Sequence, residues 1–280
     1  MLARKSAETS IEKNFVILGN QIFPGGHAES IGPRPTMEDA CVTYGEFMGP
    51  NTQYYGLFDG HGGSEVSNYC SNNLHTEIIK LLKSGKNVQE AVTEAINTID
   101  SYLVSKWPYV GCTAAIAIII RDDIYMANLG DSRIILVEDG VAKRCTYDHK
   151  STDPAERKHV IERGGHIISD RVNGILMLSR AVGDGVLGKA IDKTPHFVKA
   201  KRKNGMKMII ACDGVWDVMS DQEAADILEK SEHIPYAAQL IKAQALTLGT
   251  TDNVSCMVID LTPKQVPTQG IQPSPVKDDH

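Results

Sequence analysis

The arrangement of apolar segments constrains the fold more than any other feature of this chain. Short runs of β-branched and apolar residues, bounded by Gly, Asn and Asp, predict strands at 41–44, 53–58, 112–120, 124–129, 133–138, 207–212 and 254–261. Apolar residues repeat at helical spacing over 66–82 and 88–103, so each of these helices has one apolar face. Ser220 and Glu223 form a capping box before a third helix, and Pro235 opens a fourth. Runs of strands and pairs of helices predict an α+β fold, a central antiparallel β-sandwich flanked on both faces by pairs of helices.

Composition excludes several classes of protein. With 280 residues, 42% of them hydrophobic, the chain can build a core that needs no disulfides. A formal charge of −6 argues against bulk attraction to nucleic acid or to an anionic membrane. The longest strictly apolar run, 114–120, is far shorter than the roughly 20 residues of a membrane span. The six cysteines are widely spaced in apolar runs and indicate reduced core residues, so we expect a cytoplasmic protein, with the nucleus as an alternative.

The two ends of the chain differ from its body. Residues 1–14 are polar and predict a flexible N-terminal extension. Residues 262–280 combine Pro, Gln and charge without an apolar period, which is typical of a disordered tail. One domain over 15–261 remains.

Acidic residues stand at the ends of the predicted strands. Asp59 and Asp213 end strands, Asp252 precedes one, and the pair Glu38 and Asp39 precedes another. A cluster of carboxylates held there would be unfavourable without cations. Oxygen donors of this kind favour magnesium, manganese or calcium over zinc. The simpler interpretation is a turn, because Asp-Gly is a common hairpin signal.

The Asp-Gly pairs do not all have the same context. The pair at 139–140 lies between two strand-like runs and predicts an ordinary hairpin turn. The pairs at 59–60 and 213–214 each lead into a helix instead. Taken singly, either would be a turn about as often as a metal site.

Six motifs in a fixed order distinguish these interpretations. They are Met37-Glu38-Asp39-Ala40, Asp59-Gly60-His61-Gly62-Gly63, Asn128-Leu129-Gly130-Asp131-Ser132-Arg133, Leu178-Ser179-Arg180-Ala181-Val182-Gly183-Asp184, Ala211-Cys212-Asp213-Gly214-Val215-Trp216-Asp217 and Thr251-Asp252-Asn253. In this order the chain resembles the metal-dependent serine/threonine protein phosphatases of type 2C, the PPM family. The resemblance spans roughly 25–261 and implies that 15–261 is a phosphatase catalytic domain. It also implies hydrolysis of phosphoserine and phosphothreonine, with phosphorylated proteins as partners.

The resemblance implies two Mn²⁺ or Mg²⁺ ions per active site. Asp59 would bridge both ions, Glu38 and the Gly60 carbonyl would complete one site, and Asp213 with Asp252 would hold the other. A hydroxide bridging the two ions would attack phosphorus directly, so no phosphoenzyme is required.

A weaker third ion is also implied, because some relatives hold one. Asp131, with Asp213 and Asp217, would bind it here; the alternative for Asp131 is to cap the turn before Ser132. Asp39 would support the ligands without binding metal itself.

Two basic groups receive catalytic roles by the same resemblance. Arg34 would bind the substrate phosphate, for which its planar fork is suited; the alternative is a solvated charge in a Pro-rich loop. His61 would be the general acid that protonates the leaving oxygen; the alternative is a structural hydrogen bond. Arg180 is expected to be structural.

Two segments depart from the family's pattern. After Asp184, we expect a short flap over the active site, from 185 to about 204, ending in the basic residues Lys199, Lys201, Arg202, Lys203 and Lys207. Such a run is a solvated face, a nuclear signal or a surface that attracts acidic substrate. The second departure is Ser151, which follows Lys150 where the family usually has Pro and should affect only a loop.

Two other functions are open from the sequence. A pseudophosphatase would keep the fold without catalysis, but such proteins typically lose one or more of the metal-binding carboxylates that are all present here. A two-metal nuclease would use similar ions but would need a basic groove. We therefore expect a monomeric phosphatase without nucleic-acid or membrane partners, whose substrate the sequence does not identify.

Overall fold

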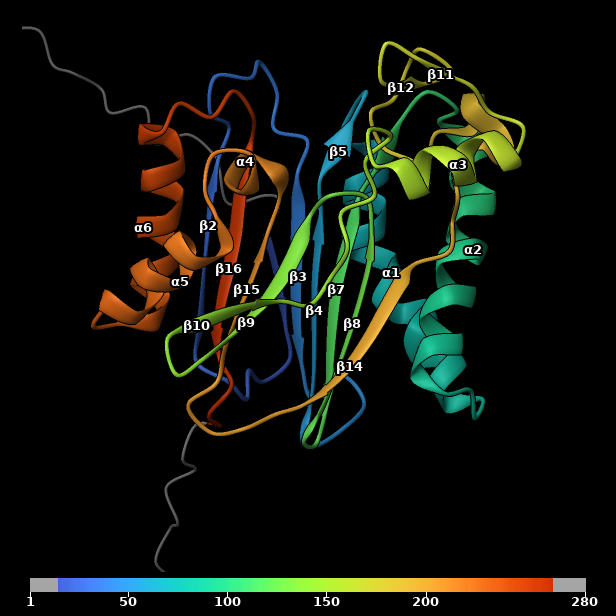
Figure 1. The fold of residues 1–280 in the computed structure, drawn as a ribbon. Coiled ribbons are helices and arrows are strands. Elements are labelled where there is room, and N and C mark those ends of the chain that lie inside the picture. The colour runs from blue at the N-terminus through green and yellow to red at the C-terminus, as the bar shows by residue number, and fades with distance from the viewer. Residues whose placement is uncertain (1–14, 264–280) are drawn as a thin grey trace, which may run out of the picture.

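Two β-sheets pack face to face at the centre of the computed structural model, which describes residues 15–263 (Figure 1). The six-stranded sheet has the order β1-β3-β4-β7-β8-β14, with strands β1 (Phe15–Leu18), β3 (Ala40–Gly45), β4 (Thr52–Phe58), β7 (Ala114–Ile120), β8 (Asp123–Leu129) and β14 (His196–Lys201). The five-stranded sheet has the order β10-β9-β15-β16-β2, with strands β10 (Val141–Arg144), β9 (Arg133–Glu138), β15 (Lys207–Ala211), β16 (Val254–Asp260) and β2 (Gly25–Ser30). The strand pairs of both sheets are antiparallel except β1 with β3, which is parallel.

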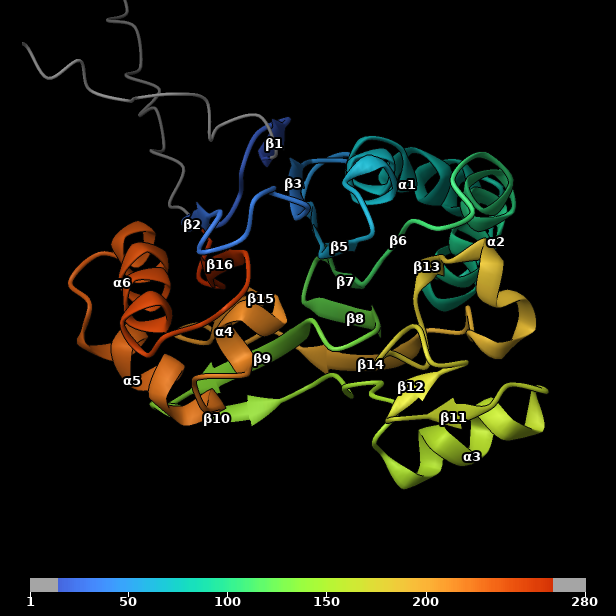
Figure 2. The same ribbon diagram turned by 90° about the horizontal axis from the view of Figure 1, so that it is seen from above.

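A pair of helices covers the outer face of each sheet (Figures 1 and 2). Helices α1 (Glu65–Lys83) and α2 (Val88–Lys106) pack on the six-stranded sheet, and α5 (Asp221–Lys230) and α6 (Ile234–Thr247) pack on the five-stranded sheet. A third apolar cluster fills the space between the sheets. The predicted α+β sandwich is confirmed, with the single parallel pair as a difference.

Strand β7 shows why the sequence folds into these layers. Its residues read Ala-Ala-Ile-Ala-Ile-Ile-Ile, without the polar alternation of a half-exposed strand. Ile116 and Ile118 belong to the cluster beneath α1 and α2, whereas Ala117 and Ile119 belong to the cluster between the sheets. Because successive side chains point to opposite faces, a strand buried on both faces must be apolar throughout.

Two local predictions are also confirmed. The capping box of α5 is complete, with reciprocal hydrogen bonds between Ser220 and Glu223. The 139–140 pair joins β9 to β10, and both of its residues have positive φ, 51° and 76°, as a type I′ hairpin turn requires.

Shorter elements gather at one end of the sandwich, the upper end in Figure 1. They include α4 (Asp213–Trp216) and a small sheet of β5 (Gly60–His61), β6 (Gly111–Cys112) and β13 (Val182–Gly183). Beside them stands a lobe formed by residues 150–192 (Figure 2). The lobe contains α3 (Pro154–Glu162), β11 (Ile167–Ile168), β12 (Arg171–Val172) and the 3₁₀ helix η2 (Gly185–Ala190), and it has a small apolar core of its own.

The prediction of a flap over 185–204 is wrong in its second half. Residues 196–201 form β14, which pairs antiparallel with β8 so that Lys201 lies opposite Asp123, at the far end of β8 from Asp131. Six residues of strand separate these ends by about 20 Å. Lys199 and Lys201 both form ion pairs with Asp123, at 3.1 and 2.6 Å. Lys199 and Lys201 therefore lie on an edge strand away from the acidic cluster, where Asp123 neutralises them.

The remaining expectations concern the chain ends and the cysteines. The predicted extension over 1–14 lies outside the described residues, as does the predicted tail except for Thr262 and Pro263. All six cysteines are buried and unpaired, as predicted. Among the helices within 15–263, none combines the length and the apolar character needed to cross a membrane.

Candidate active site

The ends of strands from both sheets place four aspartates at the upper end of the sandwich. Asp59 follows β4, and Asp131 lies between the end of β8 and the start of β9, where the chain crosses from one sheet to the other. Asp213 follows β15 and begins α4, and Asp252 precedes β16. Because β15 is antiparallel to β16, the end of the first strand and the start of the second meet at the same edge.

Three of these carboxylates form a close cluster. Oxygen atoms of Asp59, Asp131 and Asp213 all lie within 4.8 Å of one another. Burial raises the pKa of Asp59 and Asp213 well above the ordinary value, and the charges of the neighbouring aspartates raise both further. Burial also raises the pKa of Asp131, against the opposing effect of Lys150. Such a group is unfavourable when ionised unless cations join it.

Asp39 adjoins this cluster from inside the protein. It is completely buried, and neither carboxylate oxygen has a hydrogen bond of ordinary geometry within the described chain. Burial raises its pKa to about 6. The Cys212 thiol lies within 4.8 Å of Asp39 and Asp59, but burial and these two acids raise its pKa well above the ordinary value. It therefore stays protonated and leaves an all-oxygen donor set, which suits Mg²⁺ or Mn²⁺.

Glu38 and Gly60 lie next to each other but outside the close carboxylate groups found within residues 15–263. The Glu38 carboxylate accepts hydrogen bonds from the Thr36 hydroxyl at 2.9 Å and the Gly63 amide at 3.3 Å. A Cβ atom at position 60 would lie 2.4 Å from the Glu38 carbonyl oxygen, so only glycine permits this approach.

Arg34 is anchored to a predicted metal ligand. One guanidinium nitrogen donates to Asp252 at 2.5 Å, and Nε donates to the Thr251 carbonyl at 3.1 Å. The Arg34 side chain is half exposed. Its guanidinium group therefore sits at the solvent edge of the acidic site, held by one of the carboxylates.

His61 has a partner that the motif pattern does not assign. Its Nε2 lies 2.8 Å from Oδ2 and 3.0 Å from Oδ1 of Asp184, a nearly buried carboxylate at the start of η2. A Cβ atom at position 111 would lie 2.2 Å from Asp184 Oδ2 and 2.5 Å from His61 Nε2. Gly111 of β6 therefore leaves the space in which the pair meets.

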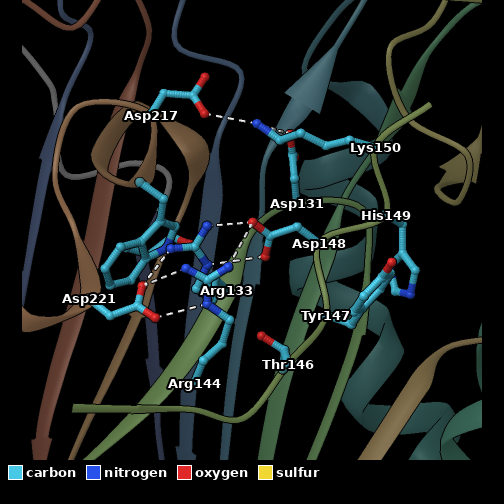
Figure 3. A network of polar contacts seen from close by, with 12 residues as sticks. Asp131, Arg133, Arg144, Thr146, Tyr147, Asp148, His149, Lys150, Asp217 and Asp221 are labelled. Carbon is cyan, nitrogen blue, oxygen red and sulfur yellow. Dashed lines mark hydrogen bonds and ion pairs between the residues drawn. The ribbon is translucent and has the colours of Figure 1, made fainter. Parts of the chain in front are cut away.

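Asp217 lies on the outer side of the cluster, with a lysine between it and Asp131. Lys150 Nζ is 2.8 Å from Asp217 Oδ1 and 3.4 Å from Asp131 Oδ2 (Figure 3). The sequence assigned both aspartates to a third ion but gave no role to Lys150.

Two motif arginines are structural. Arg133 donates from Nε to Asp148 at 3.1 Å and from Nη1 to Asp221 at 2.6 Å, which ties β9 to the 145–150 loop and the first turn of α5 (Figure 3). Arg180 binds the buried Glu156 of α3 at 2.6 Å, as expected for a structural residue.

Comparisons with known proteins agree with this fold. The family model for protein phosphatase 2C matches residues 26–254. Protein phosphatase 2C homolog 1 of Schizosaccharomyces pombe is 35% identical over 242 residues, covering 82% of this chain and 70% of that protein. The homolog 1 of Saccharomyces cerevisiae is 34% identical over 250 residues, covering 81% and 89%.

Solved structures show the same architecture. A structure described as a C. elegans sex determining protein superposes with a TM-score of 0.80 at 25% identity, covering 87% of this chain and 66% of that one. The serine-threonine phosphatase 2C of Toxoplasma gondii gives 0.76 at 21% identity, covering 86% and 95%. The chain therefore belongs to the protein phosphatase 2C family, and it is a metal-dependent protein serine/threonine phosphatase.

Proposed function

We propose that this phosphatase removes phosphate from serine and threonine side chains of proteins at the Asp59, Asp131 and Asp213 cluster, by direct attack of water on phosphorus. The observation that carries the proposal is the approach of these three carboxylates to within 4.8 Å. Two Mn²⁺ or Mg²⁺ ions held by Asp59, Asp213, Asp252, Glu38 and the Gly60 carbonyl would supply an activated water and neutralise phosphate charge. No nucleophilic side chain is needed, and the protonated Cys212 thiol does not serve as one.

Arg34 orients the substrate phosphate in this proposal. Its guanidinium group already lies at the edge of the acidic site, 2.5 Å from Asp252. When Asp252 serves as a metal ligand, the Arg34 Nη2 atom that donates to it is released toward the phosphate, whose oxygens a planar guanidinium binds in bidentate geometry.

His61 protonates the leaving serine or threonine oxygen. An imidazolium ring carries two N–H donors, so it keeps the hydrogen bond from Nε2 to Asp184 and donates the other proton. Asp184 fixes the orientation of the ring and acts as a positioning residue.

The test is Mn²⁺-dependent release of phosphate from a phosphothreonine peptide by the wild type, Asp59→Asn and Asp226→Asn. Asp226 lies on the surface of α5 and serves as a matched control for the same chemical change. We expect Asp59→Asn to abolish Mn²⁺-dependent turnover and Asp226→Asn to leave it intact. Turnover that survives Asp59→Asn would exclude this site.

Two expectations about the whole molecule stay predictions. These are a monomeric state and a cytoplasmic or nuclear location. Gel filtration with light scattering tests the first of them.

A further inference from the structure

The carboxylates of the acidic site fall into two groups, according to whether a lysine forms an ion pair with them. Within residues 15–263, Asp59 and Asp213 form no ion pair with a basic side chain at 4.0 Å or less. Asp131, which belongs to the close cluster, and Asp217, which lies outside it, share the ammonium group of Lys150 and are called the outer carboxylates below (Figure 3). Asp59 and Asp213, the inner carboxylates, therefore lack a protein cation, and Asp252 beside them is paired with Arg34 at the solvent edge. The outer carboxylates already share one cation.

The backbone of Lys150 is held on both sides. The preceding residue, His149, donates its amide to the Gly130 carbonyl at 3.0 Å, next to Asp131. The following residue, Ser151, donates its amide to the Met177 carbonyl of the lobe at 2.7 Å, and Lys150 itself forms a β-bridge with Leu178. The backbone of the lysine is thus fixed relative to the acidic cluster and to the lobe, within reach of both aspartates.

The Lys150 side chain stays protonated and positively charged. Burial lowers its pKa, but Asp131 and Asp217 more than offset this effect and raise the pKa above the ordinary value. The side chain is one third exposed, so its ammonium group has a path to solvent if another cation takes its place.

We propose that Lys150 is a tethered cation that occupies the outer half of the acidic site, so that a divalent ion binds between Asp131 and Asp217 only by displacing its ammonium group. The inference rests on the proposed function only in taking the inner carboxylates as the sites of the tighter ions. Lys150 then sets the affinity of the weakest ion, because one oxygen of Asp131 and one of Asp217 are already paired with its positive charge. When free divalent ions are scarce, the Lys150 ammonium group balances the negative charges of Asp131 and Asp217.

The test measures metal binding in the absence of substrate. Mn²⁺ is titrated into the metal-free full-length protein by calorimetry, with free Mn²⁺ counted by electron paramagnetic resonance. The proteins compared are the wild type, Lys150→Gln, Lys150→Arg and Lys207→Gln. Lys207 is the matched control, because it is also a partly buried lysine in an ion pair, 2.6 Å from Glu229, at the opposite end of β15 from Asp213.

The expected result is specific to the weakest ion. Lys150→Gln should bind it at least about tenfold more tightly, equivalent to roughly 1.4 kcal/mol, while the tighter ions keep their affinities. Lys150→Arg and Lys207→Gln should bind all ions as the wild type does. The gain should disappear when Asp217→Asn is added to Lys150→Gln. The proposal would be overturned if Lys150→Gln bound the weakest ion with the wild-type affinity, or if the gain in affinity persisted in the variant that also carries Asp217→Asn.

A second measurement uses the unaltered protein and is independent of any folding defect. Lysine acetylation by a water-soluble reagent, followed by peptide mass spectrometry, should be slow at Lys150 without metal and faster at the Mn²⁺ concentration that fills the weakest site. The exposed Lys201 should react equally throughout. A constant rate at Lys150 across the titration would contradict displacement. If no Mn²⁺ binds at all, the proposed function fails; if the tighter ions bind but Lys150 changes nothing, only this inference fails.

Discussion

His61 Nε2 and Asp184 Oδ2 lie 2.8 Å apart, although 123 residues separate them in the sequence. Asp184 has a left-handed backbone conformation, φ 55°, at the start of η2, and its side chain is nearly buried. The pair resembles the histidine–carboxylate arrangement by which a buried acid holds an imidazole in one orientation. The geometry thus gives the proposed general acid a fixed direction that the motif alone does not specify.

Asp184→Asn should impair the proton-donating step selectively. We expect the turnover of a phosphothreonine peptide to fall by about tenfold or more, because an amide does not hold the imidazolium as a carboxylate does. Hydrolysis of p-nitrophenyl phosphate should fall much less, since its leaving group has a low pKa and needs little protonation. The measurement is the ratio of the two rates, with its pH profile.

Asp192→Asn is the matched control for this ratio. Asp192 pairs with His159 at 2.9 Å in the lobe, so the variant breaks a similar histidine–carboxylate contact away from the acidic cluster. Its ratio of rates should equal that of the wild type. Equal losses on both substrates in Asp184→Asn would contradict the positioning role.

The acidic cluster was predictable because its aspartates stand at the ends of apolar runs, a pattern that is visible in the sequence. Asp59 and Asp213 each end a strongly apolar strand and precede a helical segment, so the sequence itself marks them as residues at a sheet edge. That Asp59 and Asp213 lie close together depends on the order of the strands in the sheets. This order was expected only from the family resemblance that the six motifs carry. Asp184 and Lys150 were missed because their partners are distant in sequence, 123 residues for His61 and 67 for Asp217.

The lobe and β14 were not predictable for a different physical reason. Helix α3 buries only Val160 and Glu156, and the latter depends on Arg180, which comes from outside the helix. Such a helix has no apolar stripe for a periodicity argument to detect. In β14, lysines alternate with Val198 and Ala200, which face the core between the sheets. The charge of these lysines obscured a strand that is half buried.

Arg133→Ala should destabilise the fold strongly. The Arg133 guanidinium is nearly buried and bonds to Asp148 and Asp221, so its loss removes the main partner of Asp148 and one of the two arginines that bind Asp221. We expect a loss of about 3 kcal/mol in the free energy of unfolding, measured by urea denaturation. Arg144→Ala is the matched control, because Arg144 binds the same Asp221 from a half-exposed position and should cost less than about 1 kcal/mol. Similar losses in both variants would contradict the assignment of Arg133 as the central group.

Glu29 predicts a pH dependence of stability in the metal-free protein. Burial raises its pKa from 4.5 to about 7, with a further contribution from Asp39, and its Oε1 atom has no hydrogen-bond partner within the described residues. The folded state therefore binds a proton that the unfolded state releases, so this contribution to stability is present below pH 4.5 and is lost as the pH rises through 7.

Glu29→Gln should remove that dependence. At pH 8 in a metal chelator, we expect the free energy of unfolding to increase by about 2 kcal/mol, after allowance for partial exposure of the side chain. Near pH 4.5 the gain should be close to zero. Glu232→Gln, on an exposed glutamate, should show neither effect. A gain that is the same at both pH values would show that it does not come from the ionisation of Glu29.

Asp213→Asn should stabilise the metal-free protein while removing its response to metal. Burial and the charges of Asp131 and Asp252 raise the pKa of Asp213, which means that its ionised form is unfavourable in the folded chain without cations. Replacing one carboxylate by an amide relieves that repulsion, so thermal unfolding in a chelator should shift upward by several degrees, equivalent to about 1 to 2 kcal/mol. Added Mn²⁺ should raise the melting temperature of the wild type by mass action but that of Asp213→Asn far less. Melting curves of both proteins, with and without Mn²⁺ at pH 8, test this directly. An Asp213→Asn protein that melts lower than the wild type in chelator, yet still gains the full Mn²⁺ shift, would mean that Asp213 supports the fold and does not hold a cation.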